Sequence, residues 1–446
     1  MATFSQDARY AIRVISKSPA FTAVAVVTLA LGIGANTAIF SVANALLLRP
    51  LPYPQPDRLV LLSAEKKVAG TRGGPLTFPR VTFIQQQSRS FSSVAGFTNE
   101  VFNLSGRGDP EQLSSARVSW NFFETLGVPP ALGRAFRPEE DQPGGDPVVL
   151  ISNALWTRVF ARNPSAVGQH LTLDAKDCTI IGVLPPDFRF GFLGSAVEII
   201  APRVFDLNII TPQQVRGGSG FLGAVARLET GVEIGQAQAE VNALSAAYRA
   251  ENPTLPDADP AMAVAVGNLR DELVSNVRTA VLILFGAVSL VLVIACANVA
   301  SLLLSRALGR KREIAVRTAM GASRTELIRQ LLTESLMLAL LGGALGAVLS
   351  SWGTRVLASL AEDSLPRTSE IHTDGYVLLF TVAVSIVAGI LFGLAPALQI
   401  SRPDLNTDLR SEGRGATSGR RRHALRNLLV VSQVALSLVL LIGPAC

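Results

Sequence analysis

Charged residues, cysteines and histidines are scarce in this sequence of 446 residues. Only 17% of the residues are Asp, Glu, Lys or Arg, whereas soluble domains usually carry about a quarter. The three cysteines lie far apart from one another, and so do the three histidines: Cys178, Cys296, Cys446, His170, His372 and His423. Without a C-x-x-C pair or a cluster of ligand-type residues, the sequence predicts neither a disulfide framework nor a metal site.

The short motifs of several enzyme classes are also missing. No Gly-Lys dipeptide occurs, so the sequence lacks the G-x-x-x-x-G-K-[ST] loop that holds the phosphates of ATP. Neither a G-x-S-x-G nucleophile elbow nor an H-E-x-x-H zinc motif is present. We therefore expect no catalytic residues and no cofactor bound by this chain.

Long apolar runs are abundant by contrast. Because every backbone polar group in hydrocarbon must bond within the protein, about 18 or more consecutive apolar residues indicate a membrane-spanning helix. Four complete runs and the start of a fifth are present, at residues 21–48, 277–304, 331–360, 376–398 and 428–442. The sequence therefore predicts an α-helical membrane protein with four complete transmembrane helices plus the start of a fifth.

The first apolar run leaves one alternative open, because its triplet Ala43-Asn44-Ala45 resembles a signal-peptide cleavage site. The apolar part of a signal peptide is only about 7–15 residues long. The run at 21–48 is much longer, so we favour a retained helix. Before it, residues 4–17 interleave charged and apolar side chains and predict a short amphipathic helix at the membrane surface.

Residues 49–276 have the composition of a water-soluble domain that is large enough to bury its own core. Short β-rich runs and helical runs are mixed in this region: strands at 58–63, 148–152, 170–173 and 179–184, and helices at 152–160 and 234–250. The sequence therefore predicts a large α+β extracytoplasmic domain. The Gly/Ser-rich residues 216–220 are interpreted as a flexible loop rather than a phosphate cradle, since no suitable strand and Lys accompany them.

Basic residues cluster beside the apolar runs, which is typical of cytoplasmic flanks rather than of a nucleic-acid surface. Lys and Arg are frequent before the first run, within residues 306–329 and within 402–422. Residues 361–375 instead carry four acids against Arg367 alone. The bias predicts a multi-pass membrane protein, with its N-terminus and the 306–329 segment cytoplasmic and the large domain outside.

A basic amphipathic segment joins the second and third apolar runs. Gly321 suits the end of a helix, where a left-handed residue is common. Ser323 and Glu326 then have the spacing of a capping box. Two helices are thus predicted to meet at a corner near residues 321–323, and the second enters the membrane. The pattern alone is equally well explained by a positive-inside loop with a helix hairpin.

Polar and small residues inside the apolar runs predict helix packing. The GxxxG pairs Gly342/Gly346 and Gly389/Gly393 permit close approach of neighbouring helices. Asn36 and Asn298 are expected to hydrogen-bond neighbouring helices. Near the inner end of the third run we interpret Glu334 as a snorkelling or helix-paired residue rather than a functional site.

These stretches carry a family resemblance that covers essentially the whole chain. The matching segments are residues 7–13, 30–41, 48–53, 167–173, 181–188, 312–323 and 331–346. The segments after 312 resemble the cytoplasmic coupling segment of MacB/FtsX-type ABC transporter permeases, and those between 167 and 188 resemble the MacB periplasmic core domain. The N-terminal segments resemble a duplicated (acidobacterial-type) permease subfamily.

The resemblance implies a mechanism called mechanotransmission. A separate cytoplasmic ABC ATPase dimer, which binds the ATP, would dock on the loop and move the long helices and the external domain, exporting or extracting a substrate. The implied coupling residues are Arg312, Glu313, Ile314, Arg317, Met320, Gly321 and Ala322. The alternative is an FtsX-like non-transport membrane regulator or sensor that acts on an extracytoplasmic partner; a passive scaffold is a third possibility.

A short internal repeat is found near the two ends of the chain. Residues 9–13 resemble residues 422–426, and each segment precedes an apolar run. We expect the chain to be the first half of a duplicated protein, partnered by a second permease unit, either the C-terminal half of the same chain or a dimer mate. The expected boundaries are 1–20 (amphipathic helix), 21–48 (first span), 49–276 (core domain), 277–305 (second span), 306–322 (coupling loop), 323–360 (third span), 361–375 (external loop), 376–399 (fourth span), 400–426 (linker) and 427–446 (start of the fifth span).

Overall fold

The computed structural model describes residues 4–66, 71–106, 109–186, 188–193, 197–208, 210–309, 323–360 and 374–400. These residues form two compact units. One holds the residues up to Leu48 and those from Val277 onward, and the other holds Arg49–Asn276. We call them the membrane unit and the core domain, and describe each by itself.

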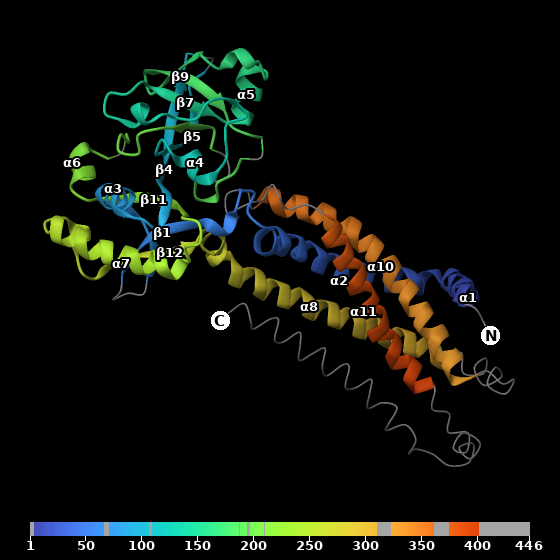
Figure 1. Cartoon of the computed structure of the whole chain (residues 1–446). Coiled ribbons are helices and arrows are strands. Elements are labelled where there is room, and N and C mark those ends of the chain that lie inside the picture. The colour runs from blue at the N-terminus through green and yellow to red at the C-terminus, as the bar shows by residue number, and fades with distance from the viewer. Residues whose placement is uncertain are drawn as a thin grey trace, which may run out of the picture. The chain divides into compact units, whose positions relative to one another are not determined.

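Long helices make up the described part of the membrane unit (Figure 1). They are α1 (Phe4–Ser16), α2 (Pro19–Ala43) with the π-helical turn η1 (Asn44–Leu48), α8 (Leu269–Gly309), α10 (Arg324–Leu360) and α11 (Gly375–Ile400). Pro19 occupies the first turn of α2, where its missing N–H costs nothing. The chain therefore leaves α1 and starts a new helix at this position.

Four of these helices are long and apolar enough to cross a membrane, over Pro19–Leu48, Val277–Arg306, Ile328–Val356 and Gly375–Leu394. This confirms the prediction of four transmembrane helices. The fifth apolar run, residues 428–442, lies outside the described residues.

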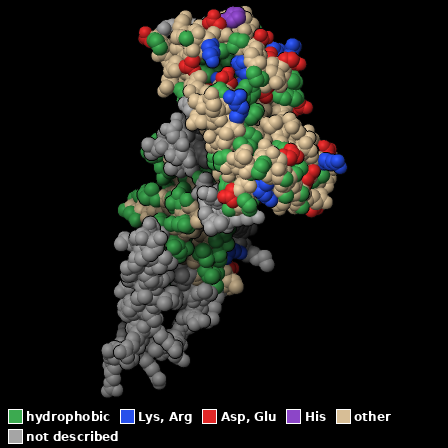
Figure 2. Space-filling model, turned by 90° about the vertical axis from the view of Figure 1, so that its left-hand side faces the viewer, with side chains coloured by type: hydrophobic (Ala, Val, Ile, Leu, Met, Phe, Trp, Pro, Cys, Tyr) green, Lys and Arg blue, Asp and Glu red, His purple; other side chains and the backbone are tan. Residues whose placement is uncertain are grey.

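The two units expose different kinds of side chain. The exposed large apolar side chains lie almost entirely on the membrane helices, for example Ile283, Val348 and Leu379. Figure 2 shows hydrophobic side chains dominating the described part of the membrane unit, whereas acidic and basic side chains are scattered over the core domain. Apolar exposure of this extent fits a surface that contacts lipid rather than water.

A twelve-stranded sheet organises the described part of the core domain, in the order β12-β1-β11-β4-β5-β10-β7-β9-β6, with β2, β3 and β8 paired beside this path. The strands are β1 (Leu59–Lys66), β2 (Thr71–Gly74), β3 (Leu76–Thr77), β4 (Phe91–Ser105), β5 (Glu111–Val118), β6 (Leu132–Gly133), β7 (Val148–Ile151), β8 (His170–Leu173), β9 (Lys176–Val183), β10 (Ile199–Ala201), β11 (Gly220–Leu228) and β12 (Met262–Asn268). The mixture of strands and helices confirms the predicted α+β class.

The 15-residue strand β4 divides this domain into two lobes (Figure 1). Its first half pairs with β11, from Phe91 to Phe97, and its second half pairs with β5, from Phe97 to Leu104. We call the part with β1–β3, β11 and β12 the first lobe, and the part with β5 and β7–β10 the second lobe. The predicted strand runs lie in β1, β7, β8 and β9.

Short helices cover the sheet and close three apolar clusters. They are α3 (Phe78–Gln87), α4 (Phe122–Leu126), α5 (Asn153–Phe160), α6 (Pro212–Arg216) and α7 (Ile234–Glu251), with 3-10 turns η2 (Pro56–Arg58), η3 (Pro138–Asp141), η4 (Pro164–Ala166), η5 (Gly191–Leu193) and η6 (Pro256–Ala258). In the first lobe α3 and α7 pack on one face of the sheet. The second lobe has a cluster under α5, and α4 contributes to a third cluster. Strand β4 supplies side chains to all three.

The Gly/Ser-rich patch at 216–220, interpreted as a loop, is only partly one. Arg216 ends α6, and Gly220 already begins β11 and pairs with Thr77 of β3. Only residues 217–219 form the turn between these elements. Gly218 has φ +78°, a conformation that glycine adopts readily and other residues rarely do.

Candidate coupling site and helix packing

The predicted coupling residues lie in a segment that is outside the described residues. Arg312, Glu313, Ile314, Arg317, Met320, Gly321 and Ala322 all fall within 310–322. The structure describes the helices on either side of this segment, α8 up to Gly309 and α10 from Arg324. What the structure shows next to the candidate site is therefore the packing of α10, the helix that follows this segment in the sequence.

The start of α10 has the predicted capping box. The Glu326 carboxylate accepts a hydrogen bond from the Ser323 backbone N–H at 3.0 Å, and the Glu326 N–H donates to Ser323 Oγ at 3.3 Å. This reciprocal pair satisfies two donors that the first helical turn leaves open. The bond from the Ser323 N–H holds the pKa of Glu326 below its usual value. The beginning of α10 is thus fixed by side chains.

Glycines bring α10 into backbone contact with α2. A Cβ placed on Gly346 would lie 3.0 Å from the Ala30 carbonyl oxygen and 3.0 Å from Gly34 N. One turn earlier, a Cβ on Gly342 would lie 2.7 Å from the Leu29 Cβ. Any side chain at these positions would push the helices apart. Sequence reasoning missed the partner glycine, Gly34, although its place in a small-residue stretch of the first run was a signal.

The same arrangement joins α10 to α11. A Cβ on Gly389 would lie 3.1 Å from the Ala339 Cβ, and one on Gly393 would lie 2.8 Å from the Ser335 Cβ. Gly343, which the sequence reasoning passed over, faces the Ser385 Oγ at 2.1 Å from its ideal Cβ position. The helix α10 is therefore packed closely against α2 through one set of glycines and against α11 through another.

Neutral polar side chains add hydrogen bonds between helices. Asn36 of α2 donates to the Val288 carbonyl of α8 at 2.8 Å and accepts from Ser289 Oγ at 3.1 Å, which confirms its predicted role. Thr37 and Thr381 join α2 to α11 through their hydroxyls at 3.1 Å. These bonds tie both α8 and α11 to α2.

Two charged residues of the membrane unit, one within α10 and one near the end of α8, have partners. Glu334 of α10 is buried and accepts a hydrogen bond from the Gln330 amide at 3.3 Å, so it is paired along its own helix. Arg306, near the end of α8, lies with its guanidinium carbon 4.8 Å from the centre of the Phe21 ring, which is a cation–π distance. Both observations fit residues that stabilise the bundle.

No group of His, Cys, Asp and Glu that could hold a metal ion occurs among the residues that the structure describes. The two cysteines in that part of the chain, Cys178 and Cys296, are free. The arrangement thus offers packing, capping and interhelical hydrogen bonds, which position the helices.

These features define a class of protein: a multi-pass membrane protein with a large α+β domain inserted between its first and second transmembrane helices. Residues 22–244 match the MacB-like periplasmic core domain, and residues 285–405 match the FtsX-like permease C-terminal domain. The chain therefore belongs to the MacB/FtsX-type ABC transporter permeases.

Curated relatives are about 25% identical to this chain over the residues that align. The macrolide export ATP-binding/permease protein MacB of Agrobacterium fabrum is 24% identical over 64% of this chain and 42% of its own length. The MacB of Bdellovibrio bacteriovorus is 25% identical over 84% of this chain and 55% of its own length. The chain thus spans about half the length of these relatives.

Two of the solved structures similar to this chain are a periplasmic region and an extracellular domain. The periplasmic region of MacB from Actinobacillus actinomycetemcomitans is 13% identical and covers 52% of this chain and 97% of that one, with a TM-score of 0.37. The extracellular domain of the noncanonic ABC-type transporter YknZ from Gram-positive bacteria is 12% identical and covers 47% and 98%, with a TM-score of 0.33.

Proposed function

We propose that this chain is the permease part of an ABC-type transporter that works by mechanotransmission in the inner membrane. A separate cytoplasmic ATPase dimer would dock on residues 306–322, with Arg312, Glu313, Arg317 and Gly321 among the contact residues. ATP would bind to that partner and not to this chain. The transmitted motion would drive the core domain to export or extract a substrate.

The observation that carries this proposal is the continuity of α10 from its capped start to its glycine contacts. The Ser323–Glu326 box fixes the beginning of the helix, and Gly342 and Gly346 then press it against α2. Because packed helices shift as rigid rods rather than deform, a push at residue 323 is passed to α2. The chain continues directly from α2 into the core domain.

The proposal includes an orientation. Its support is the bias of Lys and Arg toward one side of the spans, with the N-terminus and residues 306–322 in the cytoplasm. Export is supported by the MacB relatives, which are macrolide export ATP-binding/permease proteins. A second permease unit, as a further part of the same chain or as a dimer mate, would complete the transporter.

The test is reconstitution of the chain in nanodiscs with candidate ATPases and measurement of ATP hydrolysis. The expected result is a stable complex with stimulated hydrolysis that Arg317→Glu and Gly321→Pro abolish. The matched control is Arg414→Glu, the same charge reversal outside the coupling loop, which should leave the stimulation intact. Failure of every ATPase to bind would remove the transport proposal and favour an FtsX-like regulator that acts on an external partner.

A further inference from the structure

The N-terminal helix α1 uses its apolar side for packing on the other helices of the membrane unit. Ala11 is 0% exposed, and Ile15, one turn later, packs against the apolar cluster of this unit. Thr22 Oγ1 of α2 donates a hydrogen bond to the Ile15 carbonyl at 2.9 Å, which ties the end of α1 to the first span. An amphipathic helix that lies on a membrane normally places its apolar side among the acyl chains. In this chain it is the opposite side of α1 that meets the surroundings.

That opposite side is basic. Arg9, Arg13 and Lys17 are exposed and follow one another at intervals of four residues, so they share one side of a helix. The Lys17 N–H still donates to the Arg13 carbonyl at 3.2 Å, and the helical spacing therefore extends to it. Ile12 lies among these cations and is 60% exposed. We call Arg9, Ile12, Arg13 and Lys17 the basic face of α1.

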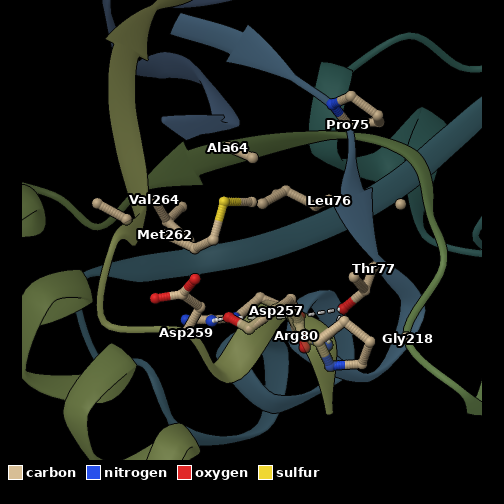
Figure 3. Close-up of a pocket in the computed structure, with 13 residues that line it drawn as sticks. Ala64, Pro75, Leu76, Thr77, Arg80, Gly218, Asp257, Asp259, Met262 and Val264 are labelled. Carbon is tan, nitrogen blue, oxygen red and sulfur yellow. Dashed lines mark hydrogen bonds and ion pairs between the residues drawn. The ribbon is translucent and has the colours of Figure 1, made fainter. Parts of the chain in front are cut away.

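The three cations of the basic face have no partner within the described part of the chain. Arg9, Arg13 and Lys17 form none of its ion pairs and donate none of its side-chain hydrogen bonds. A buried arginine of the core domain behaves differently: Arg80 is paired with Asp257 in the wall of a cavity of about 300 Å³ (Figure 3). The cations of α1 are both exposed and unpaired, so they can bind an external anion.

The place of α1 in the chain decides which anion it meets. Two residues, Lys17 and Ser18, separate the helix from the first span, which begins at Pro19. The basic face therefore lies where the chain enters the membrane, at the level of the phospholipid headgroups, and anionic headgroups attract Lys and Arg beside a span. The exposed Ile12 fits the same surroundings, because an aliphatic side chain between cations can reach the acyl chains next to the headgroups.

We propose that the basic face of α1 binds the headgroups of anionic phospholipids. The phosphate of a lipid would accept hydrogen bonds from Arg9 and Arg13, and Lys17 would add to the attraction. Ile12 would contact the first carbons of the acyl chains. This interaction lies beyond the coupling function proposed above and does not depend on it.

The experiment compares two lipids that differ in headgroup charge. The full chain in detergent micelles is titrated with phosphatidylglycerol or, as the neutral probe, with phosphatidylcholine that has the same acyl chains. Native mass spectrometry measures the fraction of protein that has bound lipid. Because each cation near an anionic lipid adds to the attraction, we expect phosphatidylglycerol to bind at least about tenfold more tightly than phosphatidylcholine.

A triple variant locates the site. Arg9→Gln, Arg13→Gln and Lys17→Gln together remove the charge of the basic face and leave the packed side of α1 intact, so the preference for phosphatidylglycerol should fall to under about threefold. Circular dichroism and the unfolding curve verify that this variant is folded.

The matched control removes the same charge from the core domain. It combines Arg89→Gln, Arg189→Gln and Arg216→Gln, three exposed arginines, and should keep the full preference.

Three results would overturn the proposal. The first is equal binding of the two lipids by the unchanged chain, and the second is a basic-face variant that keeps the full preference. The third is a control variant that loses the preference as completely, because net charge rather than α1 would then decide lipid binding. If the basic-face variant instead lost only the binding of a candidate ATPase, with its lipid preference unchanged, the face would belong to an acidic protein partner.

Discussion

The two units of this chain are packed by opposite kinds of residue. In the core domain, large rings fill the interior: Phe97, Phe122 and Phe190 lie with ring centroids 5.0–6.2 Å apart. In the membrane unit the closest helix contacts are made by residues with almost no side chain, such as Gly34 and Gly346. Water drives apolar side chains together, but lipid does not, so membrane helices associate through close backbone approach instead.

Most of the buried polar contacts follow the same division, although α10 also buries Glu334. The core domain buries complete ion pairs, Arg117 with Glu100 and Arg80 with Asp257. The membrane unit joins its helices through neutral groups, such as the amide of Asn36 and the hydroxyls of Thr37 and Thr381. Neutral hydrogen bonds give an interhelical contact without placing an ion in hydrocarbon. The comparison leads to predictions that separate the two kinds of packing.

The largest effect is expected in the aromatic core. Phe122 is 0% exposed and contacts the rings of Phe97, Phe123 and Phe190, so Phe122→Ala should lower the free energy of unfolding of the core domain by about 3–5 kcal/mol. Denaturant unfolding of the full chain, followed by circular dichroism, measures the loss. Val101→Ala is the control, because this apolar side chain on β4 is 46% exposed and should change stability by less than about 0.5 kcal/mol.

The next effect concerns a single added methyl group in α10. Gly346→Ala places a Cβ 3.0 Å from backbone atoms of α2, and the overpacking should cost about 1–3 kcal/mol. On the same helix, a Cβ at Gly353 meets nothing within 4 Å. Gly353→Ala should therefore be neutral or stabilise the helix by up to about 1 kcal/mol.

Reversible unfolding of the membrane unit in mixed detergent micelles compares these two variants. The Gly346→Ala variant should also show less stimulation of a partner ATPase, since α10 and α2 would separate. A result in which both alanines have the same effect would mean that helix propensity, rather than close backbone approach, decides the packing.

A smaller loss is expected from the neutral hydrogen bonds. Asn36→Leu removes two bonds from α2 to α8 and should destabilise the bundle by about 1 kcal/mol, as interhelical bonds in membranes typically do. Thr28→Val is the control, because within the described part of the chain the Thr28 hydroxyl bonds to the Val24 carbonyl of its own helix and to no other helix. Equal losses in the same micelle assay would show that the interhelical geometry contributes nothing.

The smallest effect is the pH dependence of the helix cap. The pKa of Glu326 is lowered by its bonds to Ser323, so the cap contributes stability above the ordinary glutamate pKa of about 4.3. This contribution is lost as the pH falls through the lower pKa of the folded helix. Carbon-13 NMR of the Glu326 carboxyl should place its midpoint below about 4.3. Ser323→Pro, which removes the N–H donor, should move that midpoint upward, and a lack of movement would contradict the cap.

Sequence reasoning predicted the elements that depend on local pattern. The apolar runs gave four of the helices, and the spacing of Ser323 and Glu326 gave the capping box, because both signals lie within a few turns of one helix. The helix α7 was predicted at 234–250 and is observed at Ile234–Glu251. For such elements the residues that decide the structure are neighbours in sequence.

Pairing between residues that are distant in sequence could not be predicted from local pattern. Strand β1 pairs with β11 and β12, which follow more than 150 residues later, and no local signal specifies that register. The GxxxG pairs indicated small surfaces on α10 and α11, but not that Gly34 and Ser335 would be their partners. The coupling residues Arg312 to Ala322 stay a prediction that rests on the family resemblance.

The long strand β4 has a consequence for how the core domain bears load. Its backbone hydrogen-bonds to both lobes, and it supplies Val94, Phe97 and Phe102 to the three apolar clusters in turn. Neither lobe can therefore unravel and leave the other with an intact sheet. A force applied to one lobe is resisted by interstrand hydrogen bonds of β4 that continue into the other lobe, so the two lobes deform together.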